Sequence, residues 1–234
     1  MSDHPDTSKE LVQKAAEKYS EVSALRAAVQ LIPYIGGPLD TLIGGEGQKI
    51  QQRRIAHFIE ELDRKIKVIE TPKQSLEKEE LYDLMVSVFE QVAKSRSIEK
   101  RVRFAQIISH EIATVNTIED VELAIRLVGE LDDLHIKILH LAIHAPASEL
   151  FDGLKVLAFS SDIQKKFVVG NNTFPVLTNL IPDIPKPMLG LICSELISKG
   201  LLRDEGAGRP FIGGVKEYFV ATDLAAWLFT WIRN

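Results

Sequence analysis

The last fifty or so residues of this chain change character several times within a short distance, which constrains the fold more than any other feature. An amphipathic segment begins at Pro187 and stops at Gly200, so a helix followed by a turn is expected there. Two short apolar runs on either side of a glycine-rich stretch, 206–214, then predict two strands joined by a loop. Thr222 follows as a candidate cap for a last helix.

The region before this helix is rich in turn-forming residues from Gly170 to Pro187. Thr173 is a candidate cap for a short helix that runs to Ile181. The resulting order of helix, turn, helix, strand, loop, strand and helix resembles the winged helix-turn-helix superfamily. This resemblance implies a small α domain with a β-hairpin, and such modules usually bind DNA. The expected inward face of the second helix and the strand after it consists of Leu189, Ile192, Leu196 and Leu201.

The first 145 residues predict helices alone, joined by short turns. The segments 7–10 and 71–74 have the form of a capping box, in which a Thr hydroxyl and a Glu or Gln side chain satisfy free amides at a helix start. Asp132 and Asp133 are candidate caps for a further helix. We therefore predict a mainly α protein with a helical domain at 1–145 and a winged-helix domain at 146–234. The expected apolar stripes are Leu81, Leu84, Met85, Val88, Phe89 and Val92; Ile98, Val102, Ala105, Ile108 and Ile112; Ile118, Val121, Ile125 and Val128; and Leu134, Ile138 and Leu141.

The side chains of the winged-helix region fit DNA binding poorly. A DNA-reading helix presents Arg, Lys, Asn or Gln to base edges, whereas this one begins with Lys186, Pro187, Met188 and Gly190. The whole chain has 28 basic and 33 acidic residues, a net charge of -5, so no global field attracts a phosphate backbone. We therefore favour a winged helix that contacts protein. In the alternative, a DNA-binding regulator, the residues touching phosphate or groove are Lys186, Lys199, Arg203 and Arg209.

One basic run, 94–103, has five basic residues and one acidic residue. Lys94, Arg96 and Arg101 are candidates for an anion-binding edge, to which the amides of a helix N-terminus would contribute. The competing interpretation is a solvated face whose charges pair with neighbouring glutamates.

The segment 24–45 is apolar but is interrupted by a Pro-Tyr-Ile-Gly-Gly-Pro sequence. A single membrane-spanning helix needs about 20 consecutive apolar residues, so this interrupted segment should not span as one helix. The favoured interpretation is a sharp turn between two core helices. The alternative is a membrane-acting effector, in which a trigger releases these residues as a hairpin that meets the bilayer.

No pattern of catalytic, metal-binding or cofactor-binding residues is recognisable. His140 and His144 lie one helical turn apart, but no further ligand completes a known zinc spacing, and His135 falls on another face. The glycine-rich 44–49 segment lacks the Lys-Ser/Thr ending of a phosphate-binding loop. Cys193 is expected to be a buried structural thiol. We expect no catalytic residue, metal or cofactor.

The segments 103–112 and 128–139 resemble little-characterised bacterial proteins of the abortive-infection alpha type, which are associated with phage defence. The resemblance covers about forty residues and implies a bacterial cytoplasmic protein that acts through contacts. The N-terminal residues, which are acidic and lack the basic and apolar regions of a signal peptide, also favour the cytoplasm. The leading hypothesis is therefore a non-enzymatic protein that binds a protein partner or a second copy of itself.

Overall fold

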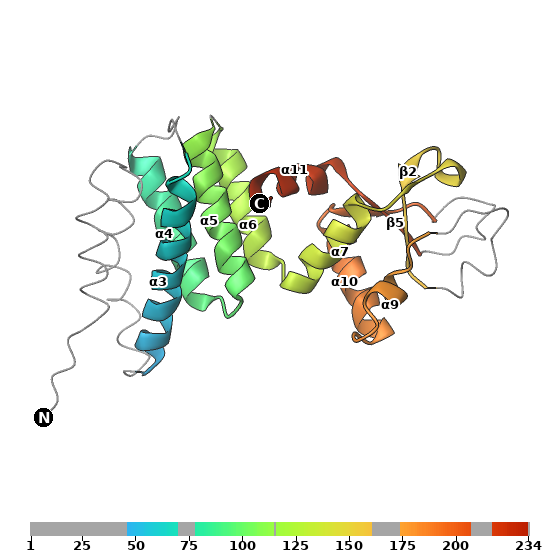
Figure 1. Ribbon diagram of the computed structural model, residues 1–234, viewed down its shortest axis with the longest axis horizontal. Helices are drawn as coiled ribbons and strands as arrows, with labels where there is room; N and C mark the ends of the chain where they lie inside the picture. The colour runs from blue at the N-terminus through green and yellow to red at the C-terminus, as the bar shows by residue number, and fades with distance from the viewer. Residues whose placement is uncertain (1–45, 70–77, 115, 161–173, 207–216, 234) are drawn as a thin grey trace, which may run out of the picture. The chain divides into compact units, whose positions relative to one another are not determined.

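The computed structural model is mainly helical, with small antiparallel sheets in the C-terminal part (Figure 1). The chain forms two compact units. The first runs up to Glu130 and includes the last few residues of the chain, and the second runs from Leu131 to Thr230. The structure describes residues 46–69, 78–114, 116–160, 174–206 and 217–233.

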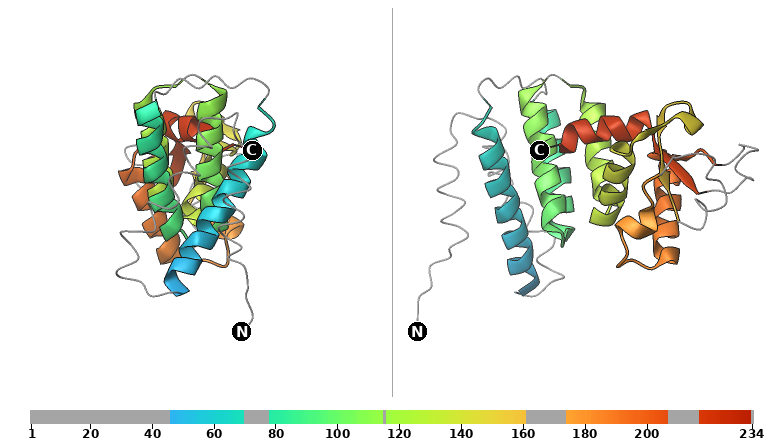
Figure 2. Two further views of the ribbon diagram at one scale, coloured as in Figure 1. Left: turned by 90° about the vertical axis from the view of Figure 1, so that its left-hand side faces the viewer. Right: turned by 45° about the vertical axis from the view of Figure 1, so that its right-hand side comes forward.

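In its described residues, the first unit contains four helices that pack side by side (Figures 1 and 2). Helix α5 contacts α3, α4 and α6, so it lies at the centre of the unit. Large side chains fill the space between them, and the rings of Phe58 and Phe89 meet edge to face with centroids 5.8 Å apart. The helices are α3 (Glu46–Ile66), α4 (Lys78–Lys94), α5 (Ile98–Ala113) and α6 (Ile118–Glu130).

The predicted stripe of α4 is confirmed where side chains are described, from Leu84 to Val92, and that of α6 is confirmed from Val121 to Val128, while its first member, Ile118, is half-buried. The stripe of α5 is wrong at its start. Ile98 is 54% exposed because it is the first helical residue, directly after the Ser97 cap, whose hydroxyl accepts from the Lys100 amide at 2.9 Å. The stripe of α7 is only partly right, since Ile138 is buried whereas Leu134 and Leu141 are half-buried.

The second unit has the order of elements predicted for a winged helix. Strand β5 is the middle strand of a three-stranded sheet and pairs antiparallel with β3 and β4, with Leu157 opposite Phe219 and Arg203 opposite Val220. Its elements are α7 (Asp133–Ile143), β1 (Ala147–Ser148), η1 (Glu149–Phe151), β2 (Leu154–Lys155), β3 (Leu157–Ala158), α9 (Leu177–Leu180), α10 (Lys186–Ser198), β4 (Leu202–Asp204), β5 (Tyr218–Ala221) and α11 (Asp223–Ile232).

Helix α10 ends at Ser198, and Gly200 forms the turn directly after it, where the sequence predicted that the helix stops. Gly200 has a φ of 71°, and its amide donates to Ile197 O at 2.9 Å while the Leu201 amide donates to Leu196 O at 2.9 Å. This pair of bonds is a Schellman motif, which satisfies carbonyls that have no partner inside the helix. The Thr222 hydroxyl donates to Gly200 O at 2.7 Å and accepts from the Ala225 amide at 3.3 Å, so the predicted cap also links α11 to this turn.

A second, two-stranded sheet between α7 and β3 has no counterpart in the sequence analysis. Strands β1 and β2 are joined through a tight turn at Asp152 and Gly153, with φ of 56° and 81°. The turn places the Phe151 ring 5.1 Å from the ring of Tyr218 on β5. Two-residue strands carry too few positions to show an alternating pattern, which is why the sequence did not indicate them.

Several predicted features lie outside the described residues. They include the first predicted helix, the apolar segment 24–45, the capping box at 71–74 and the loop with Arg209. Thr173 is also outside, and the short helix is described only as α9, with Val176 in the capping position. No helix in the described ranges is long and apolar enough to cross a membrane.

Candidate functional site

Helix α10 is apolar on both of its faces. Leu189, Cys193 and Leu196 point into the unit with at most 1% of their surface exposed. Leu191, opposite these residues, is 56% exposed, and Met188 and Ile197, on the two flanks of the helix, are 51% and 37% exposed. We call the exposed side the α10 outer face; it comprises Pro187, Met188, Leu191, Ser194, Ile197 and Ser198.

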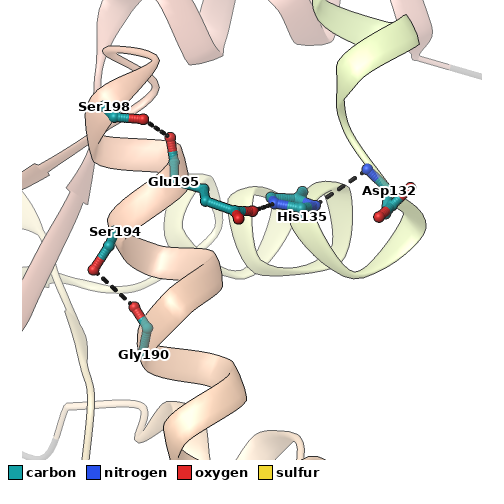
Figure 3. A network of polar contacts seen from close by, with 6 residues as sticks. All are labelled: Asp132, His135, Gly190, Ser194, Glu195 and Ser198. Carbon is teal, nitrogen blue, oxygen red and sulfur yellow. Dashed lines mark hydrogen bonds and ion pairs between the residues drawn. The ribbon is translucent and has the colours of Figure 1, made fainter.

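The two serines of the α10 outer face add little polarity. The Ser194 hydroxyl donates to Gly190 O at 2.9 Å, and the Ser198 hydroxyl donates to Glu195 O at 2.7 Å (Figure 3). Both hydroxyl protons are therefore directed to the helix backbone, as is common for serine in helices. The face offers apolar surface where a DNA-reading helix would offer hydrogen-bond donors.

A groove of about 580 Å³ lies beside the α10 outer face, between α10 and the three-stranded sheet. Phe159 and Phe219 supply aromatic walls, and their rings meet edge to face with centroids 6.1 Å apart. Gly190 widens the groove, because a Cβ at this position would lie 3.7 Å from Phe159 Cζ. The lining residues are Phe159, Gly190, Cys193, Ser194, Ile197, Asp204, Glu217 and Phe219.

Two carboxylates give this groove an acidic character. Glu217 accepts a hydrogen bond from the Ser160 hydroxyl at 3.5 Å, and Asp204 accepts one from the Gly206 amide at 2.9 Å. The pKa of the Cys193 thiol is raised to about 12, mainly by burial and secondly by the negative charge of Asp204. Burial, and secondly Glu217, raises the pKa of Tyr218. A thiol with so high a pKa is not an activated nucleophile.

The other edge of α10 is linked to α7 through a buried histidine (Figure 3). His135 Nε2 lies 2.7 Å from Glu195 Oε2, and His135 Nδ1 accepts from the Asp132 amide at 3.1 Å. Because Nδ1 accepts, the proton shared with Glu195 belongs to Nε2. His135 thus takes the place that Glu or Gln has in a capping box, and it fixes α10 against the start of α7.

The residues of the DNA-binding alternative do not form one cluster. Lys186 and Lys199 lie at opposite ends of α10, about 20 Å apart at 1.5 Å per residue. Arg203 is on β4 and forms an ion pair with Glu205. Arg209 lies outside the described residues.

The three candidates for an anion-binding edge differ in exposure. Lys94 and Arg96 are exposed, whereas Arg101 is only 7% exposed and donates from Nη1 to Ser95 O at 3.1 Å and to Arg96 O at 3.3 Å. Burial, and secondly Arg54, lowers the pKa of Arg101. The Arg101 guanidinium therefore donates hydrogen bonds to carbonyls just after the end of α4. The C-terminal end of a helix favours positive charge because its dipole is negative there. Anion binding by these residues stays a prediction.

The histidine pair of α7 is not arranged as a metal site. The rings of His140 and His144 are stacked, with centroids 4.1 Å apart, and His144 Nδ1 lies 2.8 Å from the His140 carbonyl. Stacked rings direct their nitrogens past each other and not toward a shared ion. Among the described residues, no three His, Cys, Asp or Glu side chains come together as metal ligands.

Comparisons with protein-family models, with curated proteins and with solved structures gave no match. Any functional proposal must therefore come from the residues of this chain. The groove was not indicated by the sequence, since its walls come from positions as far apart as Phe159 and Phe219. The exposed part of α10 gave only a weak signal: Leu191 falls opposite the predicted inward face, whereas Met188 and Ile197 fall on the two flanks of the helix.

Proposed function

We propose that this protein acts by binding another protein through the α10 outer face and catalyses no reaction itself. The observation that carries the proposal is the exposure of Met188, Leu191 and Ile197 on the helix that would read DNA in a DNA-binding winged helix. Several exposed apolar side chains on one helix are typical of protein contact sites.

The charged side chains around α10 favour a protein partner over DNA. Arg203 is paired with Glu205, and Asp204 and Glu217 line the groove next to the helix. Carboxylates at this position repel a phosphate backbone. A role in bacterial phage defence extends this proposal only through the resemblance of 103–112 and 128–139 to abortive-infection alpha-type proteins.

Retention of partners from a lysate of the host that encodes the chain tests the proposal. We expect the full-length protein to retain the same partner in repeated crosslinked pull-downs, and Leu191→Glu to lose it. Val68→Glu is the matched control, because Val68 is 79% exposed on the other unit and receives the same acidic side chain. Circular dichroism of all three proteins checks that they are folded.

Two results would contradict the proposal. One is a protein that retains no partner and is monomeric by light scattering, because the apolar face would then have no protein to cover it. The other is equal loss of the partner in Leu191→Glu and Val68→Glu, because the effect would then not belong to the α10 outer face.

A further inference from the structure

We infer that the groove beside α10 binds an apolar side chain of the partner together with a neighbouring Lys or Arg of the same segment. This inference rests on the proposed function and names the chemistry of the partner. The ligand is thus a basic, apolar protein segment, not an acidic one.

The apolar part of the inference comes from the walls of the groove. Phe159, Phe219 and Ile197 present rings and a branched side chain to a space of about 580 Å³. Pockets of a few hundred cubic ångströms lined by aromatic residues are typical sites for side-chain anchors. Gly190 keeps the helix side of the groove open, since its missing side chain would otherwise occupy the space in front of Phe159.

The basic part of the inference comes from Asp204 and Glu217. These carboxylates line the groove, and charge complementarity with a partner Lys or Arg would set its orientation and speed its association.

The same groups disfavour the other macromolecules. Nucleic acids and anionic membranes present phosphate, which the two carboxylates would repel at the distance of contact. A protein segment can satisfy both halves of the site, because its apolar side chain reaches the aromatic walls while Lys or Arg meets the carboxylates. Leu191, which does not line the groove, adds exposed apolar surface on the same helix, so the segment has further surface to cover.

A phage-displayed library of random short peptides, selected on the immobilised full-length protein, tests the inference. We expect enriched peptides to carry Lys or Arg beside a large apolar residue. Gly190→Leu, which fills the groove, should lose this enrichment, whereas Gly190→Ala, whose Cβ makes an ordinary contact with Phe159, should keep it.

The charge requirement is measured by fluorescence anisotropy with one enriched peptide. We expect the double change Asp204→Asn and Glu217→Gln to weaken its binding about three- to tenfold at low salt. The same peptide with norleucine in place of Lys or Arg should bind the original and the changed protein equally. Circular dichroism of each variant confirms that it is folded.

Three results overturn the inference: no enriched peptide, enrichment of acidic peptides, or enrichment that Gly190→Leu leaves intact. Its failure can be distinguished from failure of the proposed function by the pull-down. A partner that is lost in Leu191→Glu but retained in Gly190→Leu would support the proposed function and contradict the inference about the groove. A partner retained by both variants removes both.

Discussion

Gly200 and Gly190 differ in how well each position would accommodate the methyl group of an alanine. Gly200 has a φ of 71°, a conformation that disfavours any side chain, whereas Gly190 lies inside α10 with room for a Cβ. We expect Gly200→Ala to lower the free energy of unfolding by about 1–2 kcal/mol. Gly190→Ala should leave it unchanged or raise it by up to about 1 kcal/mol.

Urea unfolding of the two variants measures both effects. Because each change adds one methyl group in the same region, a general effect of bulk would lower both stabilities together. Equal losses in the two variants would contradict the assignment of the Gly200 turn as the sensitive position.

Two histidines of the first unit should make stability depend on pH. Burial lowers the pKa of His110, and burial followed by Arg101 lowers the pKa of His57. Below about pH 6.5 the folded chain binds fewer protons at these positions than the unfolded chain does. The free energy of unfolding should therefore be nearly constant just above this pH and fall as the pH drops below about 6.5.

Urea titrations across this pH range, with the original protein and with His57→Gln plus His110→Gln, test the histidine assignment. The double change should flatten the dependence. An unchanged slope would mean that other groups are responsible, and a stability that increases on acidification would reverse the sign of the argument.

At the scale of elements, the basic run 94–103 spans the end of α4 and the start of α5, and its side chains differ in role. Arg101 donates to carbonyls after the end of α4 and is buried, while Lys94 and Arg96 are exposed. We expect Arg101→Ala to cost about 2–3 kcal/mol of stability, since it removes the buried hydrogen bond to Ser95 O and the part-buried one to Arg96 O. Lys94→Ala and Arg96→Ala should each cost no more than about 0.5 kcal/mol.

Thermal and urea unfolding of the three alanine variants give the comparison. Phosphate and sulfate titrations of the same variants, followed by melting temperature, separate the two interpretations of the run. Equal, small effects on unfolding, with anion stabilisation lost in all three variants, would favour the anion-binding edge over the helix-end role of Arg101.

The elements that the sequence predicted well are those with local chemical signals. Gly200 stops α10, Thr222 caps α11 and Asp132 precedes α7, and each acts on backbone groups within a few positions. Ile98 was placed wrongly because periodicity alone does not show where the first turn of a helix leaves the core. The Glu195 contact of His135 was missed, since it joins two helices sixty positions apart.

At the scale of the whole molecule, topology and charge give different expectations. The order of elements in the second unit is that of a winged helix, which by itself suggests DNA. The groove, however, combines α10 with three strands whose sequence positions are far apart, so its acidic lining could not be read from any single segment. In our proposal, the side chains that line the groove, and not the order of elements, set the chemistry of the partner.

The net charge of -5 predicts that DNA binding is absent or weak. Gel-shift titrations at about 50 and 150 mM salt should give no discrete complex at the higher salt, because few phosphates can be neutralised by the separated Lys186, Lys199 and Arg203. Glu205→Gln, which releases Arg203 from its ion pair, should increase binding at low salt only slightly. A sequence-selective complex at the higher salt that is lost when these basic residues and Arg209 are changed to alanine would instead establish the DNA-binding alternative.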